Sequence, residues 1–300
     1  MKRNKFAWTT IFLGLLLVAA VVINGTFSQI KSEKESLVIE EEGKLEVHFL
    51  DVGQGDSTLI RQGEHAMLVD AGDNLHGWQV AGYLSYLGID HLDYAIATHP
   101  DMDHIGGLDN VLQNISCDMV LMPEYERDTY SYLGLMQVLE EKAISPAAPE
   151  AGTVYKLGTA EFTILAPLDK YEEVNNNSIA FRLIHGENRF LFTGDAERDA
   201  EEDMMKSGYT LSADVYKVAH HGSRGTNSEL FMLSVRPKYA VISCGEGNEY
   251  GHPHGRVLNL LRLLRTKVFR TDEQGTIVAV SDGEKVSFSM PPSESWKAGE

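Results

Sequence analysis

The sequence predicts an α/β fold built as a four-layer αββα sandwich, in which helices cover the outer faces of two packed sheets. Strand-like and helix-like patterns alternate from residue 45 onward, and hairpins are predicted near both ends of this region. The pattern falls into two successive halves, each rich in strands and flanked by helices. A chain of 300 residues has ample material for such a core, and no second folded domain or short repeat is evident.

The first half opens with an alternating segment, followed by a glycine-rich turn at residues 51–57 and a hairpin turn at residues 62–65. Apolar residues at helical spacing predict the first helix, and proline and glycine predict a loop over residues 143–158. The predicted strands are residues 45–50, 58–61, 66–70, 92–98 and 119–122, and the predicted helices are residues 78–87, 105–113 and 130–142.

The second half repeats this order. Two strands pair across Gly186-Glu187-Asn188, and Gly194-Asp195 opens the next helix. The predicted strands are residues 161–165, 179–185, 189–193, 214–219, 239–243, 268–270, 276–281 and 285–290, and the predicted helices are residues 196–206, 228–235 and 255–264. We therefore expect one domain over residues 45–290, followed by a tail over residues 291–300.

An apolar segment precedes this domain. Lys2, Arg3 and Lys5 come before residues 6–23, which carry no charge and are long enough to span a bilayer or to serve as a signal sequence. We expect residues 1–30 to be an uncleaved signal anchor, with a cleaved signal peptide as the alternative, and residues 31–44 to be a polar tether. Basic residues ahead of the span place the domain outside the cytoplasm, either as a single-pass protein of the cell membrane or secreted.

The charge is strongly acidic and uneven. The net charge is -18, but residues 210–300 hold 11 Lys and Arg against 10 Asp and Glu. An acidic surface argues against generic nucleic-acid binding, which depends on phosphate neutralisation, but it does not exclude an enzyme that binds phosphate through metals. Cys117 and Cys244 lie in apolar segments far apart, which favours two buried thiols over a disulfide framework or a cysteine metal site.

The most informative segment is residues 99–104, at the end of a predicted buried strand. His99, Asp101, Asp103 and His104 place two imidazoles and two carboxylates within six residues. Such groups bind zinc, manganese or iron, and a bound cation brings the pKa of water toward 7. The alternative is a polar turn in which Asp103 caps the following helix.

Four further polar segments follow apolar strands. They are Asp70-Ala71-Gly72-Asp73, Thr193-Gly194-Asp195, His220-His221-Gly222-Ser223 and His252-Pro253-His254. Ligand sites in open α/β sheets collect beyond the carboxyl ends of strands, so a shared site explains these segments better than unrelated helix caps do.

Each segment also has a purely structural interpretation. Asp70 is expected either to bind backbone amides behind the site or to act in catalysis, and Asp195 either to ligate metal or to cap a helix. Adjacent side chains point apart, so one of His220 and His221 is expected to bind metal while the other faces substrate or packs. For His252 and His254, three roles remain open: contact with a substrate phosphate, proton transfer, or stabilisation of their loop.

These motifs, in this order, resemble the metallo-β-lactamase superfamily of dinuclear metallohydrolases. Residues 49–56 (FLDVGQGD), Asn176-Asn177-Ser178 and residues 220–223 (HHGS) are similar to the hydrolase domain of ComEC-type competence DNA-uptake proteins. The resemblance runs from about residue 45 to residue 290 and implies the metallo-β-lactamase fold. With one apolar span in the sequence, it implies the hydrolase module in stand-alone form.

The resemblance also implies two divalent metal ions, Zn²⁺ or Mn²⁺, and a hydroxide held between them as the nucleophile. The implied ligands are His99, Asp101 and Asp195 at one metal, and Asp103, His104, Asp195 and His220 at the other. Asp101 stands where the wider superfamily has histidine, which makes the first site rich in oxygen and favours manganese. An asparagine of residues 176–177, or water, takes the place of a further superfamily histidine.

The remaining site residues divide into two sets. Asp103 and His221 are the candidate catalytic residues. The residues expected to contact substrate or to support the ligands are Asp70, Asn176, Asn177, Ser178, Arg224, His252 and His254.

Three functions follow as hypotheses. The first is a metal-dependent phosphodiesterase or nuclease that acts on a small phosphodiester or on single-stranded DNA. The second is a metal-dependent ester or lactone hydrolase acting on an envelope substrate, which suits the acidic residues 1–209. The third is a binding protein that keeps the fold without catalysis. The sequence leaves the oligomeric state open.

Overall fold

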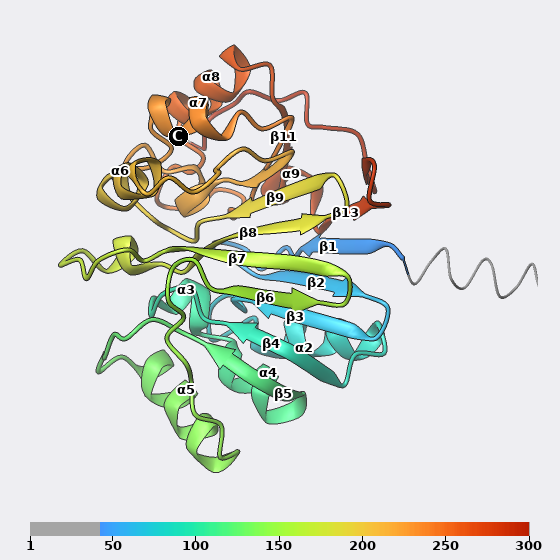
Figure 1. Ribbon diagram of the computed structural model, residues 1–300, viewed down its shortest axis with the longest axis vertical. Coiled ribbons are helices and arrows are strands. Elements are labelled where there is room, and N and C mark those ends of the chain that lie inside the picture. Colours follow the sequence, from blue (N-terminus) through green and yellow to red (C-terminus); the bar gives the residue numbers. More distant parts are fainter. Residues whose placement is uncertain (1–42, 300) are drawn as a thin grey trace, which may run out of the picture. The chain divides into compact units, whose positions relative to one another are not determined.

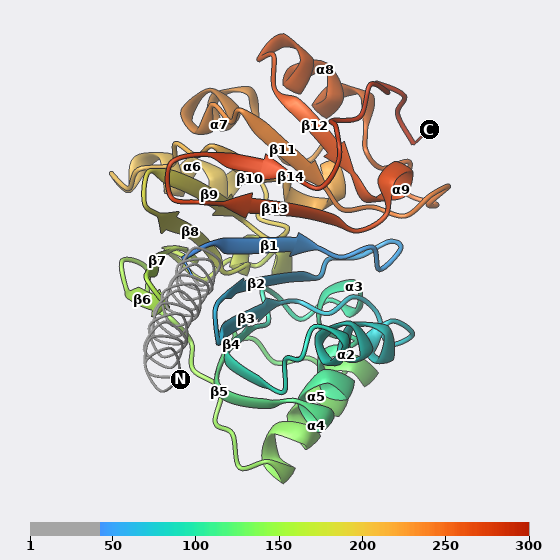
Figure 2. The same ribbon diagram turned by 90° about the vertical axis from the view of Figure 1, so that its right-hand side faces the viewer.

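The computed structural model describes residues 43–299, which contain two seven-stranded mixed sheets packed face to face (Figures 1 and 2). The first sheet has the order β14(Val286–Phe288)-β13(Ile277–Ser281)-β1(Leu45–Phe49)-β2(Thr58–Gln62)-β3(His65–Val69)-β4(His91–Ile96)-β5(Ser116–Leu121). The second has the order β12(Lys267–Arg270)-β11(Tyr239–Ile242)-β10(Val215–Lys217)-β9(Asn188–Phe192)-β8(Ala180–His185)-β7(Ala160–Ala166)-β6(Val154–Leu157).

Helices cover the outer face of each sheet, which confirms the four-layer prediction (Figures 1 and 2). The helices on the first sheet are α2(Gly77–Tyr86), α3(Met102–Ile105), α4(Leu108–Asn114) and α5(Tyr130–Glu141). Those on the second sheet are α6(Arg198–Lys206), α7(Glu229–Val235) and α8(Gly255–Leu263), and the short helices α9(Thr271–Gln274), η1(Val174–Asn177) and η2(Ala219–Gly222) lie at strand ends.

Alternation along each strand divides its side chains between two cores. In β3, Met67 and Val69 enter the core between the sheets, whereas Leu68 packs against the outer helices. In the second sheet, the rings of Phe181 and Phe192 stack between the sheets with centroids 4.7 Å apart. Burial on both faces is why these strands read as nearly continuous apolar runs.

Strand direction brings the polar segments to one edge. Strands β3, β4 and β5 run parallel, as do β9, β10, β11 and β12. The segments that begin at Asp70, His99, Asp195 and His220 therefore follow the carboxyl ends of β3, β4, β9 and β10.

The element boundaries differ from the predictions at several positions, including residues 143–158 and 105–113. The loop predicted over residues 143–158 contains strand β6, which pairs antiparallel with β7 at the edge of its sheet. The helix predicted over residues 105–113 is two helices, because the chain turns at Gly106 and Gly107. A four-residue segment that includes Lys156 gives little signal for an edge strand, and helical spacing continues across the glycine pair.

The chain ends bear on the remaining predictions. The predicted anchor at residues 1–30 and the tether up to residue 42 lie outside the described residues. No helix within residues 43–299 is long and apolar enough to cross a membrane. In the predicted tail, the Ser293 amide donates to the carbonyl of Val268, so this segment lies against β12.

Candidate metal centre

Backbone hydrogen bonds join three loops at the carboxyl edge of the first sheet. The Asp56 amide donates to the Asp103 carbonyl at 3.0 Å, and the Gly72 amide donates to the Asp56 carbonyl at 2.8 Å. The Ala71 amide donates to the carbonyl of His104, also at 2.8 Å. The loop that carries the His-Asp run is therefore fixed by main-chain contacts on two sides.

Two glycines allow this close packing. A Cβ on Gly107 would collide with the carbonyl oxygen of Ala71 and would lie 2.7 Å from the Cα of Gly77. A Cβ on Gly106 would likewise meet backbone atoms of Met102 and Asn74. The atoms that each Cβ would meet belong to the main chain, which cannot rotate out of the way as a side chain can. The glycine pair is therefore required for this loop to pack beside residues 71–77.

A Gly107→Ala substitution is expected to lower the free energy of unfolding by about 1–3 kcal/mol, because the added methyl overpacks a backbone contact. Gly82→Ala on helix α2 is the matched control, since nothing lies within 4 Å of its added Cβ. This control is expected to stabilise the protein by about 0.5–1 kcal/mol. Urea denaturation in chelator measures both, and equal effects of the two substitutions would contradict the packing account.

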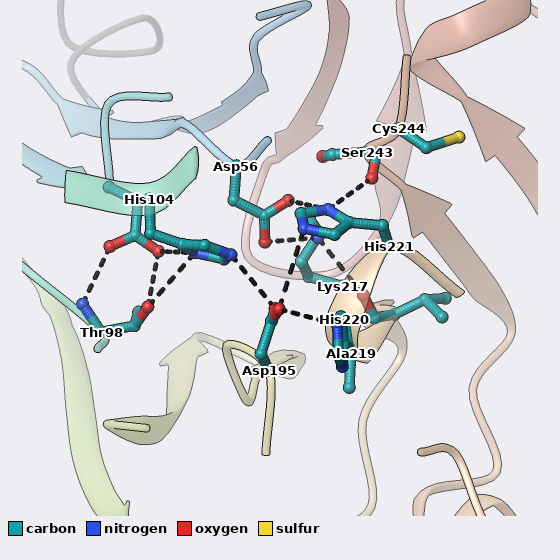
Figure 3. Close-up of polar contacts among 12 residues, drawn as sticks. Asp56, Thr98, His104, Asp195, Lys217, Ala219, His220, His221, Ser243 and Cys244 are labelled. Carbon is teal, nitrogen blue, oxygen red and sulfur yellow. Dashed lines mark hydrogen bonds and ion pairs between the residues drawn. The ribbon is translucent and has the colours of Figure 1, made fainter. Parts of the chain in front are cut away.

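The carboxylate of Asp195 lies among four histidines. Figure 3 shows three of them, His104, His220 and His221. Asp195 Oδ1 is 3.3 Å from His104 Nε2, and Asp195 Oδ2 is 3.6 Å from His220 Nε2 and 3.7 Å from His221 Nε2. The Nε2 of His99 lies 4.0 Å from the same Oδ2. The geometry brings together side chains that follow β4, β9 and β10.

Three of these atoms are buried without hydrogen bonds. Among the described residues, His99 Nε2, His104 Nε2 and Asp195 Oδ1 have no hydrogen-bond partner. Their side chains form one group in which the candidate ligand atoms lie within 4.8 Å of one another. Buried polar atoms normally have partners, and two imidazole nitrogens with a carboxylate oxygen suit zinc or manganese. The residues present therefore fit a divalent metal ion.

A second group adjoins the first and shares His104. It contains Asp103, His104 and His221, with His221 Nε2 3.1 Å from Asp103 Oδ2. His220 belongs to neither group and lies between Asp195 and Glu197, whose Oε1 is 3.6 Å from its Nδ1. Of the two adjacent histidines, the buried His221 is thus the one grouped with Asp103 and His104.

Asp101 lies at the outer side of the first group. Its Oδ2 is 3.8 Å from His99 Nε2, and its Oδ1 is 3.4 Å from Arg127 Nη2. The Asp101 side chain is 40% exposed, and burial together with the nearby Asp103 carboxylate raises its pKa. Asp101 remains close enough to His99 to join a metal there through a small movement.

Partners behind the ligands orient two of the imidazoles. Asp70 Oδ2 accepts from His104 Nδ1 at 2.8 Å and from the Thr98 hydroxyl at 2.7 Å, while Oδ1 accepts from the Thr98 amide. His221 Nδ1 donates to the Ser243 carbonyl at 3.0 Å. Each contact directs the Nε2 of its ring into the cluster, which is the usual arrangement behind metal-binding histidines. Asp70 thus supports His104 from outside the cluster.

The backbone is strained where these side chains turn inward. Asp70, His220 and His221 have φ angles of 56°, 50° and 53°, in the left-handed region that non-glycine residues seldom adopt. Aspartate and histidine enter this region more readily than most residues. The tight turn at η2 lets both members of the His220-His221 pair approach Asp195, whereas adjacent side chains in an extended strand would point apart.

Charges in the cluster are strongly coupled. Burial, followed by the charge on His104, lowers the pKa of His99 to about 4. Burial raises the pKa of Asp103, but the hydrogen bond from His221 and the charge of His104 outweigh it and bring that pKa to about 2. Burial disfavours the charged form of His221, but the carboxylates of Asp195, Asp56 and Asp103 outweigh burial and raise its pKa to about 10. The carboxylates stay ionised, and a divalent cation would take the place of the histidine protons.

A buried ion pair that the sequence interpretation missed lies beneath His221. Lys217 Nζ is 2.8 Å from Asp56 Oδ2, and Asp56 Oδ1 is 3.4 Å from His221 Nδ1 (Figure 3). The two side chains are 5% and 7% exposed and come from different sheets. The available signals were a lysine inside an apolar strand and an aspartate within the glycine-rich turn. The two residues are 161 positions apart, and no local pattern in the sequence predicts that they pair.

The asparagine segment supports the site through the backbone. Asn176 Oδ1 accepts from the Glu197 amide at 2.9 Å and so satisfies the start of α6, and Asn177 holds its own loop by bonding to Tyr171. Ser178 Oγ accepts from the Asp195 amide at 3.2 Å. The side-chain oxygens of both asparagines thus accept hydrogen bonds from backbone amides.

The last predicted residues lie on the far side of the histidine pair. The buried ring of His252 has its centroid 5.6 Å from that of His220 and 5.9 Å from that of His221. His254 Nδ1 accepts from the backbone amide of Arg224. The Arg224 side chain is exposed and makes no contact with the cluster among the residues described. His252 is therefore the member of this set that borders the centre.

The sequence matches known proteins over most of this domain. A family model of the metallo-beta-lactamase superfamily matches residues 50–246. ComE operon protein 3 of Bacillus subtilis (strain 168) is 31% identical over 266 residues, which cover 82% of this chain and 34% of that protein. Competence protein ComA of Neisseria gonorrhoeae is 29% identical over 240 residues, covering 79% of this chain and 32% of that protein. This chain spans about a third of the length of these relatives.

A solved structure shows the same fold. CmlA, a diiron beta-hydroxylase from Streptomyces venezuelae, superposes with a TM-score of 0.51 at 14% identity, covering 75% of this chain and 52% of that chain. The two mixed sheets, the ligand-rich edge and the family match agree with the ComEC-type resemblance. The chain belongs to the metallo-β-lactamase superfamily of metallohydrolases.

Proposed function

We propose that the chain is a metal-dependent phosphodiesterase, with single-stranded DNA as one candidate substrate. The observation that carries this proposal is the pair of adjoining groups around His104, in which buried ligand atoms of His99, His104 and Asp195 make no hydrogen bond. The names of relatives, including a competence protein and Recombination protein 2 of Haemophilus influenzae, support a substrate related to DNA.

The proposed ligands follow the geometry. His99, Asp195 and Asp101 would hold one metal, and Asp103, His104 and a histidine of the 220–221 pair would hold the other, with His221 favoured by its distance to Asp103. When bound, Zn²⁺ or Mn²⁺ would supply a nucleophile at neutral pH and would stabilise negative charge on the phosphate.

The protein's own groups would position substrate and move protons. Asp103 is ionised and its side chain is 31% exposed, so it can accept a hydrogen bond from an attacking water. Burial, followed by the charges on His221 and His220, lowers the pKa of His252 to about 3. A neutral His252 beside the cluster can donate a hydrogen bond to a phosphate oxygen or a leaving group.

A cavity near Asp101 favours a second candidate, hydrolysis of a neutral or cationic ester or lactone. This cavity measures about 930 Å³ and is lined by Tyr125, Tyr171, Glu124, Glu126 and other residues. Arg127 lies between this lining and the centre, since it pairs with Asp101 at 3.4 Å and its guanidinium is 5.4 Å from the Tyr125 ring centroid. Carboxylates along the wall suit a neutral or cationic group better than a polyanion.

The test is turnover by the full chain after chelation and addition of Mn²⁺ or Zn²⁺. We expect metal-dependent hydrolysis of bis-p-nitrophenyl phosphate and of single-stranded DNA, and loss of this activity in Asp103→Ala combined with His104→Ala. The matched control is Asp118→Ala with His91→Ala, an exposed pair 3.2 Å apart. Preference for esters and lactones would favour the second candidate, and absence of turnover with every metal would contradict both.

We also propose that this activity lies outside the cytoplasm. Support comes from the basic residues that precede the uncharged residues 6–23. Protease accessibility of the domain in intact cells tests this placement, and protection from added protease until lysis would contradict it.

A further inference from the structure

A cationic cavity opens at the opposite end of the second sheet from the metal centre. It measures about 530 Å³, and its lining includes Arg182, Arg189, Arg236 and Lys238 with a single carboxylate, Asp214. Asp214 directly precedes β10 and Lys238 directly precedes β11, whereas the centre lies beyond the carboxyl ends of these strands. This cavity, with four cationic side chains and one carboxylate, is positively charged, although the net charge of the chain is -18.

The side chain of Arg182 indicates that this cavity binds a ligand. Arg182 is 9% exposed, and its Nε donates to the Ser212 carbonyl at 2.9 Å. Among the described residues, the two terminal nitrogens of its guanidinium have neither a hydrogen-bond partner nor a carboxylate within 4 Å. These nitrogens are not fully buried and belong to the cavity lining, so an anion in the cavity can reach them.

The neighbouring charges do not supply an anionic partner for Arg182. Asp214 pairs with Lys238 at 2.8 Å and with Arg189, whose backbone amide lies 3.0 Å and whose Nη1 lies 3.9 Å from Asp214 Oδ2. Burial, followed by the positive charge of Arg189, lowers the pKa of Arg182. An anion between Arg182 and Arg189 would relieve this repulsion.

We propose that this cavity binds a phosphate group, either as free phosphate or as the phosphate of a lipid headgroup. A phosphate dianion matches the excess of positive charge better than a carboxylate does, and paired N–H donors of arginine suit its oxygens. The cavity volume suits a small ligand. This binding site is separate from the metal centre and does not depend on the proposed function.

Phosphate titration of the full chain by calorimetry tests the proposal, in chelator and at constant ionic strength so that the metal centre does not contribute. We expect saturable binding that weakens about tenfold or more in Arg182→Gln and in Arg189→Gln combined with Arg236→Gln. The double variant changes exposed side chains only, so it tests the cavity if the Arg182 variant misfolds. Arg198→Gln on α6, outside the cavity lining, is the control and is expected to bind phosphate as the parent does.

Sedimentation with phosphatidylcholine vesicles, with and without phosphatidic acid, distinguishes the two sources. If phosphatidic acid increases the amount of protein that sediments with the vesicles, and the double variant loses this increase, the cavity binds a lipid headgroup. If phosphate binding weakens in the variants but phosphatidic acid does not increase sedimentation, the cavity binds free phosphate. The proposal is overturned if neither ligand shows an effect of the cavity variants, or if chloride at equal ionic strength competes as well as phosphate does.

Discussion

Asp195→Ala is expected to lower kcat/KM by about a thousandfold or more and to remove most of the bound metal. This carboxylate belongs to the first candidate metal group with His99 and His104, and it lies 3.7 Å from His221 of the second group. A loss of about 4 kcal/mol of transition-state stabilisation corresponds to the expected rate effect. Metal content by mass spectrometry and turnover of the phosphodiester substrate are measured on the same samples.

The control for this variant is Asp199→Ala, an exposed residue in the first turn of α6. It removes the same charge four residues away and is expected to leave metal content and turnover unchanged. Asp195→Asn keeps the volume of the side chain but weakens its affinity for cations, so it should also lose metal. Full metal content in Asp195→Ala would show that this carboxylate is not a ligand.

Lys217→Met is expected to destabilise the protein by about 3–5 kcal/mol at neutral pH, because it leaves the buried Asp56 carboxylate without its partner. Burial raises the pKa of Asp56, but the Lys217 ammonium and the charge on His221 outweigh burial and hold that pKa below its ordinary range. A lowered folded-state pKa stabilises the parent protein above the unfolded pKa of about 4, and this stabilisation is lost as the pH falls. The difference between parent and variant should therefore narrow below about pH 4.

Chemical denaturation in chelator measures this effect across pH. Lys206→Met is the matched control, because Lys206 pairs with Glu202 at 3.2 Å on the surface and both side chains are more than 60% exposed. That exposed pair should contribute only about 0.3–0.5 kcal/mol. Adding Asp56→Asn to Lys217→Met should recover part of the lost stability, and no recovery would show that the uncompensated charge is not the cause.

Much of the candidate centre could be predicted because its residues follow apolar strands. His99 and Asp195 closely follow strands that periodicity identifies, His104 lies five residues beyond His99 on α3, and parallel strands bring their carboxyl ends to one edge. The family resemblance added the order of the ligands. Asp70 could be placed near the centre in the same way, and the structure adds its hydrogen bond to His104.

Other features depend on contacts that no local pattern reveals. Sequence spacing could not decide between His220 and His221, because the choice depends on two consecutive left-handed residues in η2. The Lys217–Asp56 pair forms only because the two sheets pack on each other, which no local sequence pattern records. The break at Gly106 and Gly107 reflects close contact with residues 71–77, which helical periodicity does not record.

The central claim is that His99, Asp195, His104 and their neighbours hold two divalent metal ions. The most direct test is a crystal structure of the full chain soaked with Mn²⁺, with the ions located by anomalous scattering. The account predicts two peaks, one bound by His99 and Asp195 and the other by His104 and Asp103. Absence of both peaks at saturating metal, or peaks bound only by residues outside this cluster, would contradict it.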